Sequence, residues 1–400
     1  MNKKIITIVI IIFCIASVFS GCVDNVDNSQ KDNQNEGISE FDSWWIEFKE
    51  PVVLDYSNYT TFYRGIWGSR LDEIRNILLK SDTLRNAGVD TVMMGPDVII
   101  NENDEVETPC KDVFIFYLQA LRREGFRILL IPNPMHPNFD DGRGFEWEEP
   151  NPDLRYQRGK ELLDKFTPVV LDWANIANTY NAEGFSTVNE LNKLVWDETN
   201  GSLWSQEILS DIRNVYSGFV GVTVTHRNVD ENEMINPCYN AEPYDYNLTG
   251  YDFLIGSPSS GWEPIDCWGL MLEHFIDFGN NLLGKYGTSN KMILYEWGAY
   301  KGGIWYEPIS EEFFMNDSQQ ADIFIQGQSR SDMISGSFPR FGAGWLLENY
   351  SNFEILKSWY LSLGNPIQSI DPQAWTEEEL TDIEKKLSDN ISGYELIFQI

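Results

Sequence analysis

Two glutamates close short apolar runs and are the side chains in this sequence best placed for acid–base chemistry. Glu190 ends the run at 185–190, FSTVNE, and Glu296 ends the run at 292–296, MILYE. A carboxylate at the end of an apolar strand lies in a poorly solvated site. Its negative charge is unfavourable there unless it takes part in catalysis or is paired with a cation. Taken singly, each glutamate would more often be a solvated or ion-paired carboxylate. Two such groups together can divide the roles of proton donor and nucleophile, which favours catalysis.

The elements around these glutamates follow a repeating unit: an amphipathic stretch, a glycine and a short apolar run. A glycine just past a helix adopts the left-handed conformation at little cost and releases the chain into a strand. Amphipathic stretches at 71–87, 111–124, 167–181 and 203–217 predict helices, the third with Thr167 as N-cap and Pro168 at its first position. The predicted strands are 63–67, 92–94, 126–131, 185–188, 219–224, 253–256, 292–295 and 342–347.

Alternating helices and near-continuous apolar strands predict an α/β fold with parallel strands buried on both faces. Eight strands over about 300 residues predict a (β/α)8 TIM barrel with long loops. A doubly wound sheet is the alternative, but it usually has an early glycine-rich phosphate-binding turn, and that spacing is absent from this sequence. Because TIM-barrel active sites lie at the carboxyl ends of the strands, Glu190 and Glu296 are expected at one mouth, ending strands four and seven.

Asn189-Glu190 at the end of strand four and Glu296 at the end of strand seven resemble the clan A retaining glycoside hydrolases. These are TIM barrels that include β-mannanases, cellulases and endo-β-galactanases. Three further features are similar to the β-mannanases of that clan: NVYSG at 214–218 before strand five, SQQA at 318–321 opening helix seven, and Trp345 on the predicted strand eight. The resemblance covers roughly residues 60 to 365.

The resemblance implies roles for four residues. Glu190 would be the acid/base and Glu296 the nucleophile of a double displacement on a β-linked glycan, with the two carboxyl groups about 5 to 5.5 Å apart. Glu190 would start protonated and Glu296 ionised. Asn189 would bind the sugar 2-hydroxyl, and Trp345 would form the stacking surface under the cleaved sugar.

The sequence departs from the pattern of that clan at two positions. Many members have a tyrosine near the end of strand six that orients the nucleophile, whereas IGSP at 255–258 contains none. Many also have an arginine at the end of strand two, where this chain has MGP at 94–96. Arg64 on strand one could substitute for that arginine and is a candidate substrate-binding residue.

Histidine and tryptophan side chains at the same mouth are further candidates for substrate binding. His136 and His226 follow strands three and five. Hydrogen bonding to a substrate and an ordinary role within a loop fit these two positions equally well. Trp297 follows strand seven, and the faces of exposed tryptophans suit sugar rings, the alternative being loop packing. Four more tryptophans fall on the same side: Trp67, Trp147, Trp262 and Trp305.

The charge balance excludes nucleic acid as a partner. The 400 residues hold 29 Lys and Arg against 62 Asp and Glu, a net charge of −33, whereas binding a polyanion needs clustered Lys and Arg. No Cys or His spacing matches a zinc site and no EF-hand loop is present, so we expect neither a metal nor a cofactor. The expected partner is an oligo- or polysaccharide, and the oligomeric state stays open.

The first residues predict export. Lys3 and Lys4 precede an apolar run at 5–19 that is short for a membrane-spanning helix. FSGC at 19–22 resembles a prokaryotic lipobox, with Cys22 as the acylated residue. An ordinary signal peptide and an uncleaved anchor are the alternatives, and all three place the remainder outside the cytoplasmic membrane. We expect an N-terminal lipid to anchor the protein to the outer face of that membrane or to the cell surface.

The composition divides the chain into four parts. Residues 1–21 are a lipoprotein-type signal peptide, 22–42 a flexible tether, 43–370 the TIM-barrel catalytic domain, and 371–400 a short C-terminal helical extension packed on the barrel. Cys14 lies in the signal peptide and Cys22 is the predicted lipid attachment site, which leaves Cys110, Cys238 and Cys267. Outside the cell, two of these three cysteines can form a disulfide. Cys238 and Cys267 are the expected disulfide, with Cys110 as the odd thiol.

Two hypotheses of function follow. The first is a surface-anchored retaining glycoside hydrolase. The second is a non-catalytic carbohydrate-binding or cell-surface protein on the same barrel, its chemistry lost through the two departures just named. The sugar, its linkage and endo or exo action are left open by the sequence.

Overall fold

The computed structural model describes residues 39–100, 105–135, 152–191, 198–228, 241–243, 245–258, 268–297, 317–340 and 350–388. The predicted signal peptide, Cys22 and most of the predicted tether lie outside these ranges, as do Cys238 and Cys267. Cys110 is a buried free thiol. Among the described helices, none combines the length and apolar character that crossing a membrane requires.

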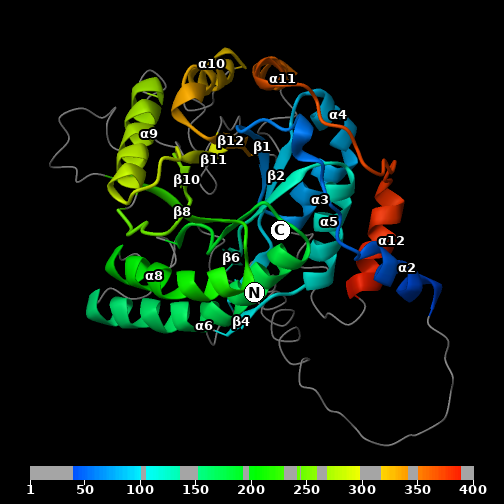
Figure 1. The fold of residues 1–400 in the computed structure, drawn as a ribbon, viewed down its shortest axis with the longest axis horizontal. Helices are drawn as coiled ribbons and strands as arrows, with labels where there is room; N and C mark the ends of the chain where they lie inside the picture. Colours follow the sequence, from blue (N-terminus) through cyan, green and yellow to red (C-terminus); the bar gives the residue numbers. More distant parts are fainter. Residues whose placement is uncertain are drawn as a thin grey trace, which may run out of the picture.

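Eight parallel strands close into a barrel, which confirms the predicted (β/α)8 fold (Figure 1). Around the barrel these are β1 (Tyr63–Gly68), β2 (Thr91–Met94), β5 (Arg127–Leu130), β7 (Gly184–Ser186), β8 (Phe219–Asn228), β10 (Phe253–Ser257), β11 (Ile293–Trp297) and β12 (Gly336–Pro339). Parallel pairing of β1 with β12 and of β8 with β10 completes the closure. Strands four and seven are therefore β7 and β11, as the sequence predicts.

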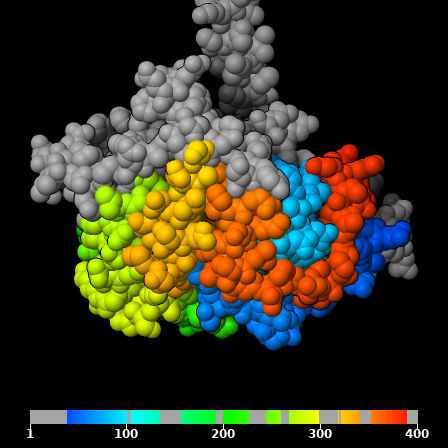
Figure 2. Space-filling model, turned by 90° about the horizontal axis from the view of Figure 1, so that it is seen from above, coloured from blue at the N-terminus to red at the C-terminus, as the bar shows by residue number. Residues whose placement is uncertain are grey.

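Helices surround the barrel (Figure 1). They are α3 (Leu71–Leu79), α4 (Ser81–Asn86), α5 (Lys111–Arg123), α6 (Pro152–Thr179), α8 (Glu198–Val215), α9 (Trp268–Lys285), α10 (Asp317–Gln328) and α11 (Tyr350–Leu363). Figure 2 shows α9, α10 and α11 side by side on the outer wall. Gly125 ends the turn after α5 with φ of +87°, the left-handed conformation expected for a glycine past a helix.

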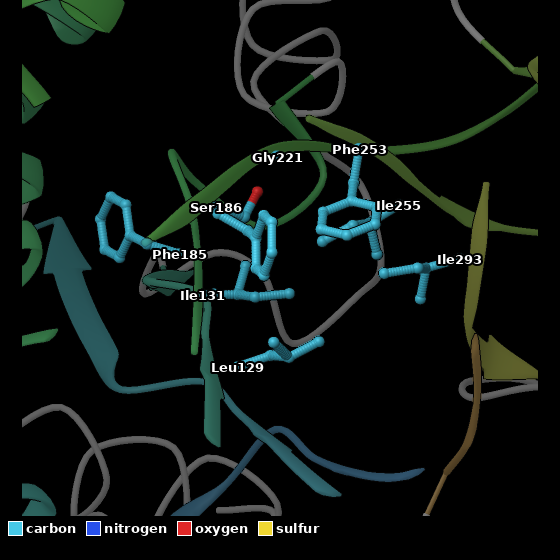
Figure 3. Close-up of a pocket in the computed structure, with 10 residues that line it drawn as sticks. Leu129, Ile131, Phe185, Ser186, Gly221, Phe253, Ile255 and Ile293 are labelled. Atoms are coloured by element: carbon cyan, nitrogen blue, oxygen red, sulfur yellow. The ribbon is translucent and has the colours of Figure 1, made fainter. Parts of the chain in front are cut away.

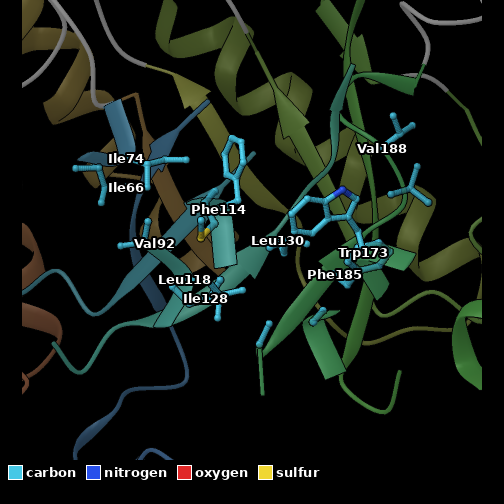
Figure 4. Close-up of a cluster of buried hydrophobic side chains, with 14 of the residues drawn as sticks. Ile66, Ile74, Val92, Phe114, Leu118, Ile128, Leu130, Trp173, Phe185 and Val188 are labelled. Atoms are coloured by element: carbon cyan, nitrogen blue, oxygen red, sulfur yellow. The ribbon is translucent and has the colours of Figure 1, made fainter. Parts of the chain in front are cut away.

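The hydrophobic core has two layers. Ten side chains fill the barrel interior: Tyr63, Trp67, Met93, Leu129, Ile131, Phe253, Ile255, Ile293, Tyr295 and Phe338. A larger layer lies between the strands and the helices, where residues such as Ile66 and Val92 meet Ile74 and Phe114 (Figure 4). The interior keeps a cavity of about 10 Å³ next to Leu129 (Figure 3), which is room for about one water molecule.

Two predicted elements are wrong in position. Strand eight is β12 at 336–339, not 342–347. Its short GSFP sequence has no apolar run, but Phe338 fits the space that Gly65 leaves, where an added Cβ would lie 2.0 Å from the Phe338 ring. The helix expected to start at Thr167 starts at Pro152 instead. The Thr167 hydroxyl donates to the Leu163 carbonyl inside this helix, at 3.0 Å, rather than capping it.

Short strands extend the barrel beyond its carboxyl end. β3 (Asp97–Ile100) pairs with β4 (Val106–Glu107) and with β6 (Asn133–Met135), so that Asp97 lies opposite Asn133. β9 (Ala241–Pro243) pairs antiparallel with the end of β8. Because β3 and β6 follow strands two and three, this small sheet stands beside the mouth where the two glutamates were predicted to lie.

Two terminal helices pack together on the outside of α5 (Figure 1). α2 (Glu40–Phe48) begins inside the range predicted as tether, because Ser39 caps it through the Asp42 amide. The ring of its Phe48 packs against Phe116 of α5 in a tilted arrangement, with centroids 5.2 Å apart. α12 (Glu377–Ser388) lies in the predicted extension and starts with a capping box in which Thr376 and Glu379 bond each other's backbone amides.

Candidate active site

The two glutamates share an unusual backbone conformation at the carboxyl end of the barrel. Glu190 follows β7 with φ of +47°, and Glu296 lies near the end of β11 with φ of +48°. In the described residues only Cys110 and Asn181 are further non-glycine residues with positive φ. The left-handed region costs a residue with a Cβ roughly 1–2 kcal/mol, and such strain concentrates at functional sites.

A β-bulge at Glu296 determines where its side chain points. Tyr295 pairs with Phe338 of β12 and Trp297 with the next residue, Pro339, so Glu296 is the extra residue. Alternation in a regular strand would send Glu296 outward, between the inward residues before and after it. Tyr295 does point into the barrel, but Trp297 packs outward. The bulge thus breaks the alternation and frees Glu296 to face the mouth.

Arg340, immediately after β12, holds the Glu296 carboxylate. Its Nη1 lies 2.8 Å from Glu296 Oε1, and its Nε lies 3.3 Å from Oε1 of Glu73 on α3. Its Nη2 donates to the Ser69 hydroxyl at 3.3 Å. Burial by itself would lower the pKa of Arg340, but the charges of Glu296 and Glu73 raise it overall. Arg340 is therefore a permanent buried cation beside the candidate nucleophile.

The prediction that Arg64 supports the nucleophile is wrong. Arg64 is fully buried at the opposite, amino-terminal end of the barrel, where its Nε lies 2.8 Å from Asp90 Oδ2. Arg127 pairs with the same aspartate, so this cluster stabilises the lower end of the barrel. A side chain at position 95, just after strand two, would not fit, because a Cβ on Gly95 would lie 2.8 Å from the Trp67 ring. The cation comes from strand eight instead.

Asn189 is held by a second amide, Asn133 of β6. Asn189 Nδ2 donates to Asn133 Oδ1 at 2.9 Å, and Asn133 Nδ2 donates to the Ser69 carbonyl at 3.2 Å. Asn189 Oδ1 is buried and has no hydrogen-bond partner in the part of the chain that the structure describes. Because an unpaired buried acceptor is costly, this oxygen is ready to accept a hydrogen bond from a bound hydroxyl.

Ser69 joins the two halves of the site. Its carbonyl accepts from Asn133, which holds Asn189 next to Glu190 in sequence. Its hydroxyl accepts from Arg340, which holds Glu296. A continuous chain of hydrogen bonds therefore links the residue beside the candidate acid/base to the candidate nucleophile.

Tyr295, the residue before Glu296, is buried in the barrel interior. Its ring packs edge-on against Trp67 with centroids 5.6 Å apart, and its hydroxyl is buried without a partner among the described residues. Burial, followed by the charges of Glu190 and Glu296, raises the pKa of Tyr295 well above its ordinary value. Since both carboxylates act on this one hydroxyl and both also act on Arg340, the two glutamates lie at the same mouth. The site therefore has a tyrosine on strand seven, in contrast to the strand-six tyrosine that this sequence lacks.

Asp97 is a buried carboxyl at the edge of this network. It is 6% exposed, and Asn133 Nδ2 reaches its Oδ1 only at 3.5 Å. Burial raises its pKa to about 7, against a smaller opposing effect of the Asn133 hydrogen bond. Sequence reasoning missed Asp97, Asn133, Ser69, Glu73 and Arg340. Ser69, Asp97 and Asn133 could have been found because each is a polar residue shortly past the apolar run of strand one, two or three. Arg340 had no such signal, because the GSFP sequence of strand eight has no apolar run, and Glu73 lies on α3.

The remaining predicted site residues divide into three groups. Trp297 was predicted to stack on a sugar, which is wrong: it is 1% exposed and packs against Phe324 and Trp359 of the outer helices. His226 lies in β8, and its side chain is outside the described set. His136 and Trp345 lie outside the described residues altogether, and Trp345 is past the end of β12. No cluster of three or more metal-ligating side chains occurs within the described ranges.

Comparisons with known proteins support the fold. The sequence matches no protein-family model and no curated protein. Its structure is similar to a GH113 β-1,4-mannanase, with a TM-score of 0.52 at 14% identity over 75% of this chain and 99% of that one. It is also similar to the GH113 β-mannanase of Alicyclobacillus acidocaldarius, with a TM-score of 0.53 at 12% identity over 76% of this chain and 99% of that one. An endo-β-1,4-mannanase of Thermotoga petrophila is similar with a TM-score of 0.53 at 12% identity over 78% of each chain. At these identities the likeness shows a shared TIM-barrel fold, as the sequence resemblance predicts.

Proposed function

We propose that this protein is a retaining glycoside hydrolase that cleaves β-linked glycans by double displacement. The observation that carries the proposal is the pair of glutamates on strands four and seven, both held in the left-handed conformation at one mouth of the barrel. The charges of both glutamates act on the same buried tyrosine and arginine, and backbone strain and interacting titratable groups of this kind concentrate at functional sites.

The proposed reaction has two steps. Glu190 donates its proton to the leaving oxygen while a Glu296 oxygen attacks the anomeric carbon, so that the glycosidic bond breaks and a glycosyl ester forms. Glu190, now ionised, then takes a proton from water, which attacks the same carbon and releases Glu296 as a carboxylate. Arg340 orients the attacking carboxylate through its 2.8 Å contact, and Asn189 Oδ1 accepts a hydrogen bond from a sugar hydroxyl.

β-1,4-Mannan is the first substrate to test, because the similar structures are β-1,4-mannanases by name. Trp345, His136 and His226 remain proposed substrate contacts. The N-terminal sequence supports export and lipid anchoring at Cys22 to the outer face of the membrane or the cell surface. An anchored hydrolase at this location would act on glycans outside the cytoplasmic membrane.

The test separates an enzyme from a carbohydrate-binding protein on the same barrel. Purified protein is assayed for reducing-sugar release from β-mannan, β-glucan, β-galactan and envelope glycans. Glu296→Ala should abolish formation of the glycosyl ester, and azide or formate should partly restore turnover with a product of inverted configuration. Glu190→Ala should still react with dinitrophenyl glycosides, which need little proton donation, and should accumulate the ester.

The competing hypothesis has a distinct signature. A binding protein would hydrolyse none of these glycans, would bind at least one of them, and would bind it equally well as the wild type and as both variants. That set of results would replace the hydrolase with the binder.

A further inference from the structure

Glu73 is a second carboxylate on the arginine that holds the candidate nucleophile. It lies on α3, is 6% exposed, and its Oε1 is 3.3 Å from Arg340 Nε. Its other oxygen, Oε2, accepts from the Ser69 amide at 2.8 Å and from the Ser69 hydroxyl at 2.9 Å. Arg340 is 5% exposed. One buried guanidinium is therefore shared between a carboxylate of the proposed reaction and a carboxylate outside it.

The proposed reaction changes the charge of one of these partners. When Glu296 becomes a glycosyl ester it loses its negative charge, and the guanidinium loses the ion pair at 2.8 Å. The charge appears on Glu190, which also acts on Arg340 but less than Glu296 or Glu73 does. A buried arginine whose counter-charge weakens is costly, so the ester would be destabilised unless another carboxylate stays in contact.

We propose, on the basis of the proposed function, that Glu73 is a positioning residue that fixes Arg340 and neutralises it while Glu296 is esterified. Glu73 does not touch the substrate. It lowers the energy of the ester relative to the free enzyme, and by sharing Arg340 it also keeps the guanidinium from over-stabilising the Glu296 carboxylate before attack. Both effects favour the first step over the second.

This role makes a prediction that a purely structural role does not. Removing the charge of Glu73 should slow formation of the ester and leave its hydrolysis unchanged or faster, since hydrolysis regenerates the Glu296 carboxylate beside an under-neutralised arginine. For substrates whose second step limits turnover, kcat/KM should fall while kcat does not. A loss of packing or of the Ser69 contacts would instead lower both together.

The test uses Glu73→Gln, which keeps the shape of the side chain, with 2,4-dinitrophenyl β-mannobioside and β-cellobioside as probes. Pre-steady-state release of dinitrophenolate measures ester formation, and the steady-state rate measures its hydrolysis. We expect kcat/KM to fall on the order of 10-fold or more, a smaller burst, and kcat at or above the wild-type value. Glu73→Asp, which restores the charge on a shorter side chain, should recover part of kcat/KM.

Glu124→Gln is the matched control, because Glu124 is also buried and paired with an arginine, Arg85, but lies at the amino-terminal end of the barrel. Glu124→Gln should leave the ratio between the rate of ester formation and the rate of ester hydrolysis unchanged. Equal falls in kcat and kcat/KM for Glu73→Gln, or no change in either, would overturn the proposal for Glu73. A wild-type protein that shows neither a burst nor an ester on Glu296 with either probe would overturn the proposed function itself.

Discussion

Asp97→Asn should change how the stability of this protein depends on pH. Asp97 is a buried carboxyl, and Asn133 Nδ2 donates to its Oδ1 at a long distance, 3.5 Å. Burial raises its pKa from 3.8 to about 7, and the charges of Asp72 and Glu73 add to the effect while Arg70 opposes it. Asparagine has the shape of the protonated acid and keeps an oxygen but cannot ionise.

The direction in which the free energy of unfolding changes with pH follows from proton binding to Asp97. Between pH 4 and 7 the folded protein holds a proton on Asp97 that the unfolded chain has released, so the free energy of unfolding falls as the pH rises through this window. A difference between 3.8 and about 7, at about 1.4 kcal/mol per unit, corresponds to roughly 4 kcal/mol. Above pH 7 the wild type has lost this stability, and the variant has not.

The measurement is urea unfolding, followed by tryptophan fluorescence at intervals from pH 4 to pH 8.5. The stability of Asp97→Asn relative to the wild type should rise by roughly 4 kcal/mol across this range, with most of the change between pH 4.5 and 7. Asp211→Asn, on the exposed face of α8, controls for the loss of one negative charge. A difference between Asp97→Asn and the wild type that stays constant with pH would refute the reasoning.

Three further predictions rest on separate features. Gly65→Ala should lower the free energy of unfolding by about 1–3 kcal/mol in urea titrations, because its Cβ would overlap the Phe338 ring; an unchanged stability would mean that β12 does not pack as described. Glu190→Gly should be more stable than Glu190→Ala by about 1 kcal/mol, since φ of +47° suits glycine; equal or reversed stabilities contradict the strain. Cys22→Ser should move the protein out of the membrane fraction or leave an unprocessed precursor, and unchanged fractionation and mass on immunoblotting and mass spectrometry would rule out lipidation there.

The regular part of the barrel could be read from the chain because it depends on local pattern. Seven of the eight predicted strands overlap observed ones. Most of them are short apolar runs that follow a helix and a glycine, and such a run is stable only as a strand buried on both faces. β12 was missed because GSFP has no such pattern. Its place depends on the fit between Phe338 and Gly65, residues brought together only when the barrel closes.

The candidate active site, too, could be predicted from the sequence only in part. The sequence alone determined the fold class and the two glutamates at the ends of strands four and seven, because position at a strand end is a local property. It could not determine that Arg340 takes the place expected for Arg64 beside the candidate nucleophile, or that Trp297 faces the helices. Those outcomes depend on a bulge at Glu296 and on Trp67 filling the space above Gly95. Contacts between strands far apart in the chain are decided by packing and charge in three dimensions, and only the tertiary structure holds that information.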